Sequence, residues 1–401
     1  MDPRDALRTH FGFEDFRPGQ AEAVAAALAD RDALVVMPTG AGKSLCYQLP
    51  ALMREDLAIV VSPLVSLMQD QVDALRRIAP ERVALVNAQQ SAAENRAALE
   101  RAVAGELRLL YVAPERFASP GFVEQIQRAR LGLFVVDEAH CVSQWGHDFR
   151  PDYFRLADAA RYLQVRTIMA LTATATPQVA DDVVGRLRLE DPLRVTTGFD
   201  RPNLSFAVVP CKTAADKQRR IAAVLGEPGA LPAIVYAGTR NGCEQLARVL
   251  EGELGEDVAV YHAGLERERR AGVQRAFMGG ETRVVVATNA FGMGVDKADV
   301  RTVCHASVPQ SLEAYYQEAG RAGRDGQPAR CLLFAEGRDK GLHVFFIQRS
   351  EVQDGSFAAI ARRLHADGAE HGRYDVELRE LAALAGDGAD TDGARAIVGH
   401  L

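Results

Sequence analysis

The residues best suited to hold a phosphate lie in a glycine-bearing turn that follows a short apolar run. The segment Leu34–Ser44 reads Leu-Val-Val-Met-Pro-Thr-Gly-Ala-Gly-Lys-Ser. Glycine N–H groups can crowd around phosphate oxygens, a lysine reaches the β/γ-phosphates, and a serine hydroxyl ligates Mg²⁺. Met37 occupies the first glycine position of the strict GxxxxGK[ST] pattern. The context still predicts a nucleotide phosphate site made by Thr39, Gly40, Gly42, Lys43 and Ser44.

The distribution of lysine favours this interpretation over a glycine-rich turn with a solvated lysine. Lys43 is the only lysine before Lys212, although the chain holds 47 basic residues. A lysine ammonium binds phosphate as a compact point charge, whereas arginine presents a planar fork. A single lysine in an arginine-rich chain therefore indicates a position that requires lysine.

Two adjacent acids follow a second apolar run, Leu133–Val136. Asp137 at the end of a buried strand can hold Mg²⁺ through its water shell, and Glu138 can orient and deprotonate an attacking water. Taken alone, such a pair is more often the start of a solvated loop. Together with the upstream phosphate turn it predicts a site of nucleoside triphosphate hydrolysis.

A third candidate is a pair of arginines at a repeated Gly-Arg spacing. The segment Tyr316–Asp325 reads Tyr-Gln-Glu-Ala-Gly-Arg-Ala-Gly-Arg-Asp. Arg321 and Arg324 are three residues apart, so they share one face of a helix or turn, and either can stabilise charge on a transferred phosphoryl group. The alternative, an exposed arginine-rich helix end, does not explain the repeated spacing.

Length and composition limit the class of protein that carries these residues. A chain of 401 residues exceeds the usual size of one hydrophobic core, so we expect two domains and a small third segment. The net charge of −7 argues against binding nucleic acid by bulk electrostatics. No signal peptide or apolar run of about 18 residues occurs, so we expect a cytoplasmic protein that does not enter a membrane.

Short apolar runs that do not alternate with polar residues predict strands buried on both faces of parallel sheets. We expect an α/β fold with two such domains, residues 1–199 and 200–338, followed by a helical segment, residues 339–401. The runs are Ala33–Met37, Leu57–Ser62, Val83–Asn87, Leu107–Val112, Leu131–Val136, Arg166–Leu171, Leu204–Val209, Ala233–Tyr236, Val258–Tyr261, Val284–Ala287, Val300–His305 and Ala329–Phe334. Helices are expected at Ser356–His365, Val376–Ala385 and Gly393–Leu401, as the incomplete start of a winged helix.

The ordered set of motifs resembles the RecQ family of superfamily 2 DNA helicases over about Leu7 to Phe334. The matching segments are Phe11–Gln20, Thr39–Ser44, Val61–Asp70, Tyr111–Arg116, Asp137–His140, Cys141–Tyr153, Leu171–Thr176, Ile234–Arg240, Tyr261–Gly264, Val286–Asp296 and Gln317–Arg324. The resemblance implies two tandem RecA-like domains that bind ATP and Mg²⁺ between them. It also implies roles for Gln20 and Arg17 in adenine recognition and for Asp296 and Gln317 at the nucleotide.

The loop after Asp137–His140 is the part most suited to sense DNA. Trp145, the sole tryptophan, and Phe149 can stack on unpaired bases while Arg150 meets a phosphate. A sole tryptophan is more often a core residue, but polar neighbours disfavour its burial. Polar residues near the ends of other strands suit a phosphodiester backbone. These further candidates are Ser62, Arg116, Thr239, Arg240, His262 and Thr288.

One departure from the resembled family concerns zinc. Many of its members carry a four-cysteine zinc module after the second domain, whereas no cysteine follows Cys331 here, so we expect no structural zinc. The six cysteines are at least 27 residues apart, which offers no CxxC motif.

The predicted activity is ATP-driven translocation on single-stranded DNA and unwinding of forked duplexes, by a monomer with no partner protein specified. The resemblance implies 3′–5′ polarity, a role in repair or recombination and, in a bacterium, association with the nucleoid. Two alternatives stay open: an RNA-remodelling enzyme of the same superfamily, and a non-catalytic DNA-binding scaffold. The Trp145 loop disfavours the first, and intact Lys43, Asp137, Glu138 and Arg324 disfavour the second.

Overall fold

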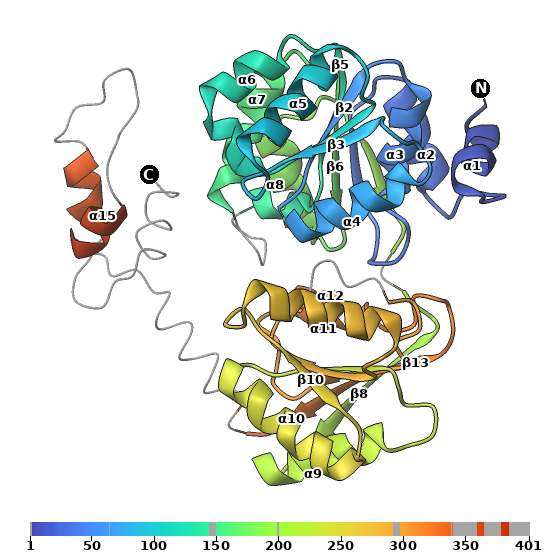
Figure 1. Cartoon of the computed structure of the whole chain (residues 1–401), viewed down its shortest axis with the longest axis vertical. Coiled ribbons are helices and arrows are strands. Elements are labelled where there is room, and N and C mark those ends of the chain that lie inside the picture. The colour runs from blue at the N-terminus through green and yellow to red at the C-terminus, as the bar shows by residue number, and fades with distance from the viewer. Residues whose placement is uncertain are drawn as a thin grey trace. The chain divides into compact units, whose positions relative to one another are not determined.

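The chain forms two compact units, residues 1–336 and residues 337–401. The computed structural model describes residues 2–63, 65–143, 150–198, 200–291, 297–337, 339, 359–364 and 378–384. The first unit contains two parallel β-sheets flanked by helices (Figure 1). The strand ends of both sheets carry the candidate site residues.

The first sheet has seven parallel strands in the order β3-β4-β2-β5-β6-β1-β7. Their bounds are β1 Ala33–Val36, β2 Leu57–Val61, β3 Val83–Val86, β4 Leu109–Val112, β5 Leu131–Val136, β6 Thr167–Thr172 and β7 Leu193–Thr196. The helices are α1 Pro3–Phe11, α2 Gln20–Leu28, α3 Leu45–Met53, α4 Val65–Arg76, α5 Ala92–Val103, α6 Pro120–Ile126, α7 Leu156–Tyr162 and α8 Pro177–Leu187. The described 3₁₀ turns of this part are η1 Pro114–Ala118, η2 Ala139–Val142 and η3 Pro151–Arg155.

Both faces of this sheet are buried, which explains why its strands are apolar without alternation. Leu34 and Val36 lie in one core cluster, whereas Val35 lies in the cluster on the opposite face. The same division separates Phe134 from Val135 on β5. Successive strand residues point to opposite faces, so each must be apolar when helices cover both.

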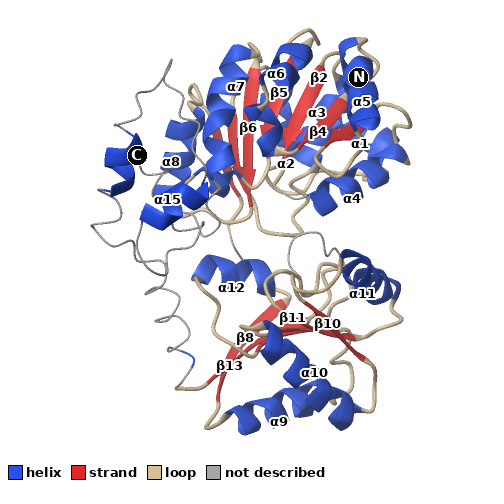
Figure 2. Cartoon of the chain, turned by 60° about the vertical axis from the view of Figure 1, so that its left-hand side comes forward, coloured by secondary structure: helices blue, strands red, loops and turns tan. Residues whose placement is uncertain are grey.

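The second sheet has six parallel strands in the order β10-β11-β9-β12-β13-β8. Their bounds are β8 Leu204–Pro210, β9 Ala233–Tyr236, β10 Val258–Tyr261, β11 Val284–Ala287, β12 Thr302–His305 and β13 Ala329–Ala335. The described helices of this part are α9 Ala214–Leu225, α10 Arg240–Leu254, α11 Arg267–Gly279 and α12 Leu312–Ala319. Figure 2 shows α9 and α10 on one side of the sheet and α11 and α12 on the other.

All twelve runs expected to form strands contain one, and the two-sheet α/β architecture is confirmed. Two details differ from the expectation. The sequence pattern missed β7, a four-residue edge strand in which Arg194 and Thr196 are exposed, because Leu-Arg-Val-Thr alternates apolar and polar residues and forms no continuous apolar run. Strand β8 was expected to be buried on both faces, but Ser205–Val208 is exposed; β8 is an edge strand of the second sheet, paired with β13 alone.

In the second unit, α15 (Leu378–Leu384) lies within the expected helix Val376–Ala385, and residues 359–364 are helical. The expected helix Gly393–Leu401 and the predicted domain boundary at Phe199 lie outside the described residues. Among the helices of the described chain, none combines the length and apolar character needed to cross a membrane.

Candidate nucleotide and nucleic-acid sites

The predicted nucleotide residues meet at the carboxyl edge of the first sheet. The phosphate turn follows β1 and the acidic pair follows β5, and only β6 separates these two strands in the sheet. Parallel strands bring their carboxyl ends to one edge, where ligands of α/β proteins commonly bind. The strand order therefore brings together residues that are almost 100 positions apart in the chain.

The backbone of the phosphate turn adopts a conformation that only glycine accepts readily. Gly40 and Gly42 both have φ +84°. A Cβ added at Gly42 would lie 2.5 Å from Nε2 of Gln20, so a side chain is also excluded there by space. Ser44 immediately precedes α3, which directs the helix N-terminus toward the turn.

Lys43 lies inside this turn, where Nζ donates to the carbonyl of Met37 at 3.1 Å. Burial lowers the pKa of the lysine, Glu138 and Asp137 raise it, and Arg324 lowers it again. These influences come from the acids after β5 and from the arginine segment near the second sheet. Lys43 is thus within electrostatic reach of the other two parts of the predicted hydrolysis site.

Arg17, just before α2, and Gln20, the first residue of α2, support the phosphate turn. Arg17 Nη1 donates to the carbonyl of Gly40 at 2.7 Å. Nε2 of the buried Gln20 donates to the carbonyls of Ala41 and Gly42, at 3.2 and 3.0 Å, and its Oε1 accepts from the N–H of Arg17 at 2.8 Å. Both hydrogens of the Gln20 amide are therefore engaged by the turn, a link that the sequence did not predict.

The two acids differ in their surroundings. Asp137 Oδ1 accepts from the N–H of Glu138 at 3.0 Å, and Glu138 itself has φ +49°. Burial and the neighbouring Glu138 carboxylate raise the pKa of Asp137, while Lys43 lowers it. Oε2 of Glu138 is buried without a hydrogen-bond donor in the described chain, and it lies 3.4 Å from Nδ1 of His140.

His140 links the acidic pair to the end of β6. Its Nδ1 lies 2.9 Å from Oγ1 of Thr172, and that hydroxyl donates to the carbonyl of Thr174 at 3.0 Å. The segment Leu171–Thr176, one of those that resemble helicase motifs, is connected to Glu138 through His140.

The arginine segment after α12 lies against the phosphate turn. A Cβ added at Gly40 would be 3.5 Å from Cγ of Arg324, and one added at Gly320 would be 3.5 Å from Cβ of Thr39. Arg321 is buried and hydrogen-bonds the hydroxyl of Tyr236, and burial raises the pKa of that tyrosine to about 12. Arg324 is thus the arginine nearer to the turn, and Arg321 contacts the second sheet.

The candidate DNA residues of the first sheet follow strands β2 and β4 and the acidic segment. Ser62 is buried, and its Oγ has no hydrogen-bond partner among the described residues. Arg150 Nη1 donates to the carbonyl of Pro63 at 3.1 Å, which joins the segment after β5 to the segment after β2. Arg116 lies on η1, with its guanidinium over the ring of Phe122 at 5.6 Å.

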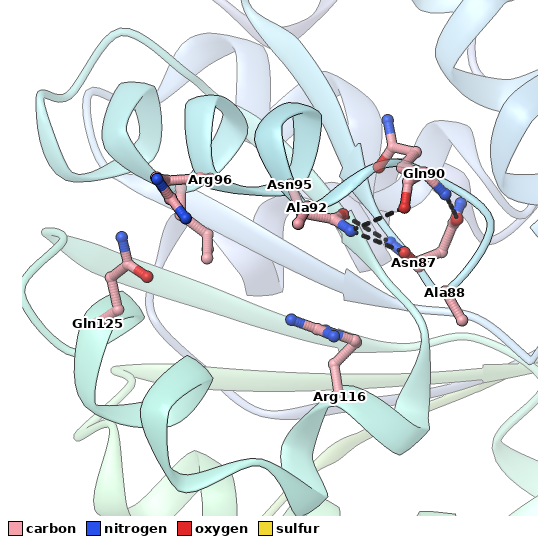
Figure 3. A pocket seen from close by; sticks show the side chains of 9 residues that line it. Asn87, Ala88, Gln90, Ala92, Asn95, Arg96, Arg116 and Gln125 are labelled. Carbon is pink, nitrogen blue, oxygen red and sulfur yellow. Dashed lines mark hydrogen bonds between the residues drawn. The ribbon is translucent and has the colours of Figure 1, made fainter.

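Arg116 also lines a polar cavity of about 360 Å³ at the ends of β3 and β4 (Figure 3). Asn87 and Asn95 make its wall rigid, because Asn95 Nδ2 donates to the carbonyl of Asn87 and Asn95 Oδ1 accepts from its N–H, at 2.9 and 3.2 Å. Arg96 and Gln125 line it as well. Asn87, Asn95, Arg96 and Gln125 were not predicted from the sequence, because side-chain amides and a single arginine on a helix form no recognisable motif.

The candidate DNA residues near the second sheet follow three neighbouring strands, β9, β10 and β11. Thr239 caps α10 by accepting from the N–H of Gly242 at 3.0 Å, and Arg240 lies against Gly264. His262 is buried, with Nε2 3.4 Å from Glu244 Oε1. Thr288 accepts from the N–H of Ala290 at 3.4 Å. These residues share the carboxyl edge of the sheet.

Three candidate site residues, Trp145, Phe149 and Asp296, lie outside the described residues. Gln317 lies on α12, two residues before the end of that helix. Their predicted roles stay predictions.

Comparison with known proteins agrees with this architecture. Residues 17–183 match the DEAD/DEAH box helicase family, and residues 217–326 match the helicase conserved C-terminal domain. The crystal structure of the helicase MrfA bound to DNA has a TM-score of 0.70 at 19% identity, over 86% of this chain and 53% of the other. The two sheets with their phosphate turn and arginine segment therefore form a pair of RecA-like helicase domains.

Two curated relatives define the group more closely. The ATP-dependent DNA helicase RecQ of Pasteurella multocida is 42% identical over 89% of this chain and 56% of its own length. The probable ATP-dependent DNA helicase RecS of Bacillus subtilis is 39% identical over 90% of this chain and 72% of its own length. The chain belongs to the RecQ family of superfamily 2 helicases. It spans little more than half the length of the Pasteurella protein.

Proposed function

We propose that this chain is the motor of an ATP-dependent DNA helicase, which couples ATP hydrolysis to movement along single-stranded DNA. One observation carries the proposal: Lys43, the acids after β5 and Arg324 converge on one turn. Arg324 lies against Gly40 and, like Asp137 and Glu138, influences the pKa of Lys43. A cradle for phosphate, a buried base and a cation beside them are the parts that phosphoryl transfer to water requires.

Each residue of the site has a defined task in this proposal. Lys43 and the N–H groups of the turn bind the β- and γ-phosphates. Glu138 accepts a proton from the attacking water, for which its buried Oε2 has a free acceptor position. Arg324, with Arg321 behind it, stabilises the negative charge that develops on the γ-phosphate.

The site also fits a magnesium ion. The adjacent acids Asp137 and Glu138 are mostly removed from water, and burial with their mutual repulsion raises the pKa of Asp137. Oxygen ligands with excess negative charge suit a hard divalent cation, and Ser44 adds a hydroxyl. Bound Mg²⁺ would neutralise charge on the phosphates. Clustered thiolates, which a structural zinc would need, do not occur in the sequence.

The polar residues at the strand ends supply the contacts to the nucleic acid. Arg116 and its cavity lie at the ends of β3 and β4, and Thr239, His262 and Thr288 follow strands of the second sheet. Opening and closing of the two RecA-like domains around ATP would shift one set of contacts relative to the other. The curated relatives compared above are named DNA helicases, which favours DNA over RNA. The proposed polarity is 3′ to 5′, on single-stranded and forked DNA in repair or recombination.

The test is phosphate release by the purified chain with and without single-stranded DNA, with RNA of the same length, and with a Lys43→Ala variant. We expect strong stimulation by DNA, weaker stimulation by RNA and no turnover in the variant. Duplexes with 3′ or 5′ tails then measure polarity. Equal turnover in the Lys43→Ala variant would refute the hydrolysis site, and stronger stimulation by RNA would refute the DNA assignment.

A further inference from the structure

Arg201 lies between the two sheets in sequence, and no motif of the sequence analysis includes it. It follows β7, the edge strand that pairs with β1 ahead of the phosphate turn, and precedes β8, which pairs with β13 of the second sheet. The N–H of Thr197 donates to the carbonyl of Val36, so the first sheet holds the segment to within four residues of Arg201. The backbone at Arg201 is therefore held by the first sheet on its N-terminal side and by β8 of the second sheet on its C-terminal side.

The guanidinium of Arg201 bridges the phosphate turn and the arginine segment. Nη1 donates to the carbonyl of Thr39 at 3.1 Å and to that of Gly320 at 3.4 Å. Nη2 donates to the carbonyls of Ala322 and Gly323 at 3.0 and 2.9 Å. One planar group thus binds the turn that carries Lys43 and both flanks of Arg321.

Asn203 reinforces the same contact. Its Nδ2 donates to the carbonyls of Gly323 and Gln327 at 2.8 and 2.9 Å, and its Oδ1 lies 3.4 Å from Nε of Arg201. A Cβ at Gly323 would lie only 2.5 Å from that Nδ2, and Gly323 has φ +54°. The arginine segment therefore packs directly on Asn203, and only glycine permits this approach.

The chemistry of arginine suits this bridge. A guanidinium offers five N–H donors in a fixed plane and can hold several carbonyls at once, whereas a lysine ammonium cannot reproduce the fork. The acceptors of Nη1 and Nη2 are neutral carbonyls, and burial lowers the pKa of Arg201. Its positive charge also lies at the turn, with Nη1 3.6 Å from the position of a Cβ at Gly40.

We propose that Arg201 is a positioning residue for ATP hydrolysis. Its guanidinium holds the carbonyls of Gly320, Ala322 and Gly323 close to the carbonyl of Thr39. The bridge thereby sets the distance from Arg321 and Arg324 to the γ-phosphate. This inference rests on the proposed ATPase function. Because misplacing a catalytic group by about 1 Å can cost on the order of a hundredfold in rate, loss of the bridge lowers turnover more than nucleotide binding.

The experiment compares Arg201→Gln, Arg201→Lys and Arg194→Gln in the full chain. Arg194 is a matched control because it lies on β7, is half-exposed and pairs with Asp181 at the surface. For each variant, kcat and KM for ATP are measured at saturating single-stranded DNA, together with the affinity for a fluorescent ATP analogue and the thermal unfolding midpoint. We expect Arg201→Gln to lower kcat by at least about tenfold with KM within about threefold. Arg201→Lys should recover only part of the rate.

Two results would overturn the proposal while leaving the ATPase function intact. One is a kcat of Arg201→Gln within threefold of the wild type. The other is a parallel loss of analogue binding and of the unfolding midpoint, which would make Arg201 a folding residue only. Absence of turnover in the wild type and in Arg194→Gln would refute the ATPase function and this inference with it.

A second comparison tests whether Arg201 acts through Arg324. Arg201→Gln is combined with Arg324→Lys, and the single-turnover rate constant for ATP hydrolysis is measured for the wild type, both single variants and the double variant. If both residues serve one arrangement, the combined loss is smaller than the product of the two single losses. A multiplicative loss would show that Arg201 acts independently and would overturn its role as a positioning residue for Arg324.

Discussion

Replacing Gly42 by alanine tests the geometry of the phosphate turn most directly. Gly42 has φ +84°, and a left-handed backbone costs an alanine about 1 to 2 kcal/mol. The new Cβ would lie 2.5 Å from Nε2 of Gln20, so this amide must move away from the carbonyls of Ala41 and Gly42. Each lost hydrogen bond costs about 1 kcal/mol. The ATP-competent turn therefore loses about 3 to 4 kcal/mol.

An energy of this size corresponds to a loss of about two to three orders of magnitude in ATP affinity. The assay is titration with a fluorescent ATP analogue, with ATP as competitor. Gly40→Ala is an informative comparison, because its Cβ would make only ordinary contacts at 3.5 and 3.6 Å and would cost the backbone strain alone. We expect about a tenfold loss for that variant.

Gly105→Ala is the matched control away from the site. Gly105 has φ +77°, and a Cβ there would meet nothing within 4 Å. The substitution carries the same kind of backbone strain and should lower the free energy of unfolding slightly without changing ATP affinity. A Gly42→Ala variant that binds ATP within threefold of the wild type, or no more weakly than Gly40→Ala, would refute the role assigned to Gln20 and the turn.

Three further outcomes are expected. Glu138→Gln should lower kcat by about two to four orders of magnitude while ATP affinity changes little, because the variant loses the base that accepts the proton from water; more than a tenth of wild-type turnover would contradict this role. Arg116→Gln should weaken binding of single-stranded DNA and reduce the slope of log K against log salt by about one, whereas the exposed Arg128→Gln should do neither. Phe134→Ala should lower the free energy of unfolding by about 3 to 5 kcal/mol in denaturant titrations, since Phe134 is fully buried with its ring 5.6 Å from that of Phe117; a loss below 1 kcal/mol would contradict the packing described.

Much of the fold was predictable because its signal is local. A strand covered on both faces must be apolar at every position, as at Val35 and Val36, so twelve strands could be located from short apolar runs. Two of the four edge strands, β7 and β8, did not follow this rule, whereas the edge strand β3 is fully buried. Strand β7 exposes Arg194 and so has no continuous apolar run, and the pattern did not predict it. Strand β8 is exposed along most of its length, although the pattern predicted burial on both faces.

The candidate site was predictable where its chemistry needs particular residue types. Lys43 and the two acids were located by type and by their position after apolar runs. The partners of Gln20 could not be located in this way, because its contacts are with backbone carbonyls, which every residue possesses. The cavity beside Arg116 was missed for a similar reason, since Asn87 and Asn95 act through amides that are common on any surface.

The sequence alone therefore determined which groups are available for the proposed chemistry: a glycine-bearing turn with its lone early lysine, a pair of acids after a buried strand, and two arginines at a glycine spacing. Only the tertiary structure decided which of these groups meet. Strand order places β1 and β5 at one edge with β6 between them, and Arg201 joins Thr39 to the segment around Arg321 through hydrogen bonds to carbonyls. Residue types encode reactivity, whereas a backbone carbonyl becomes a specific partner only when folding fixes its position.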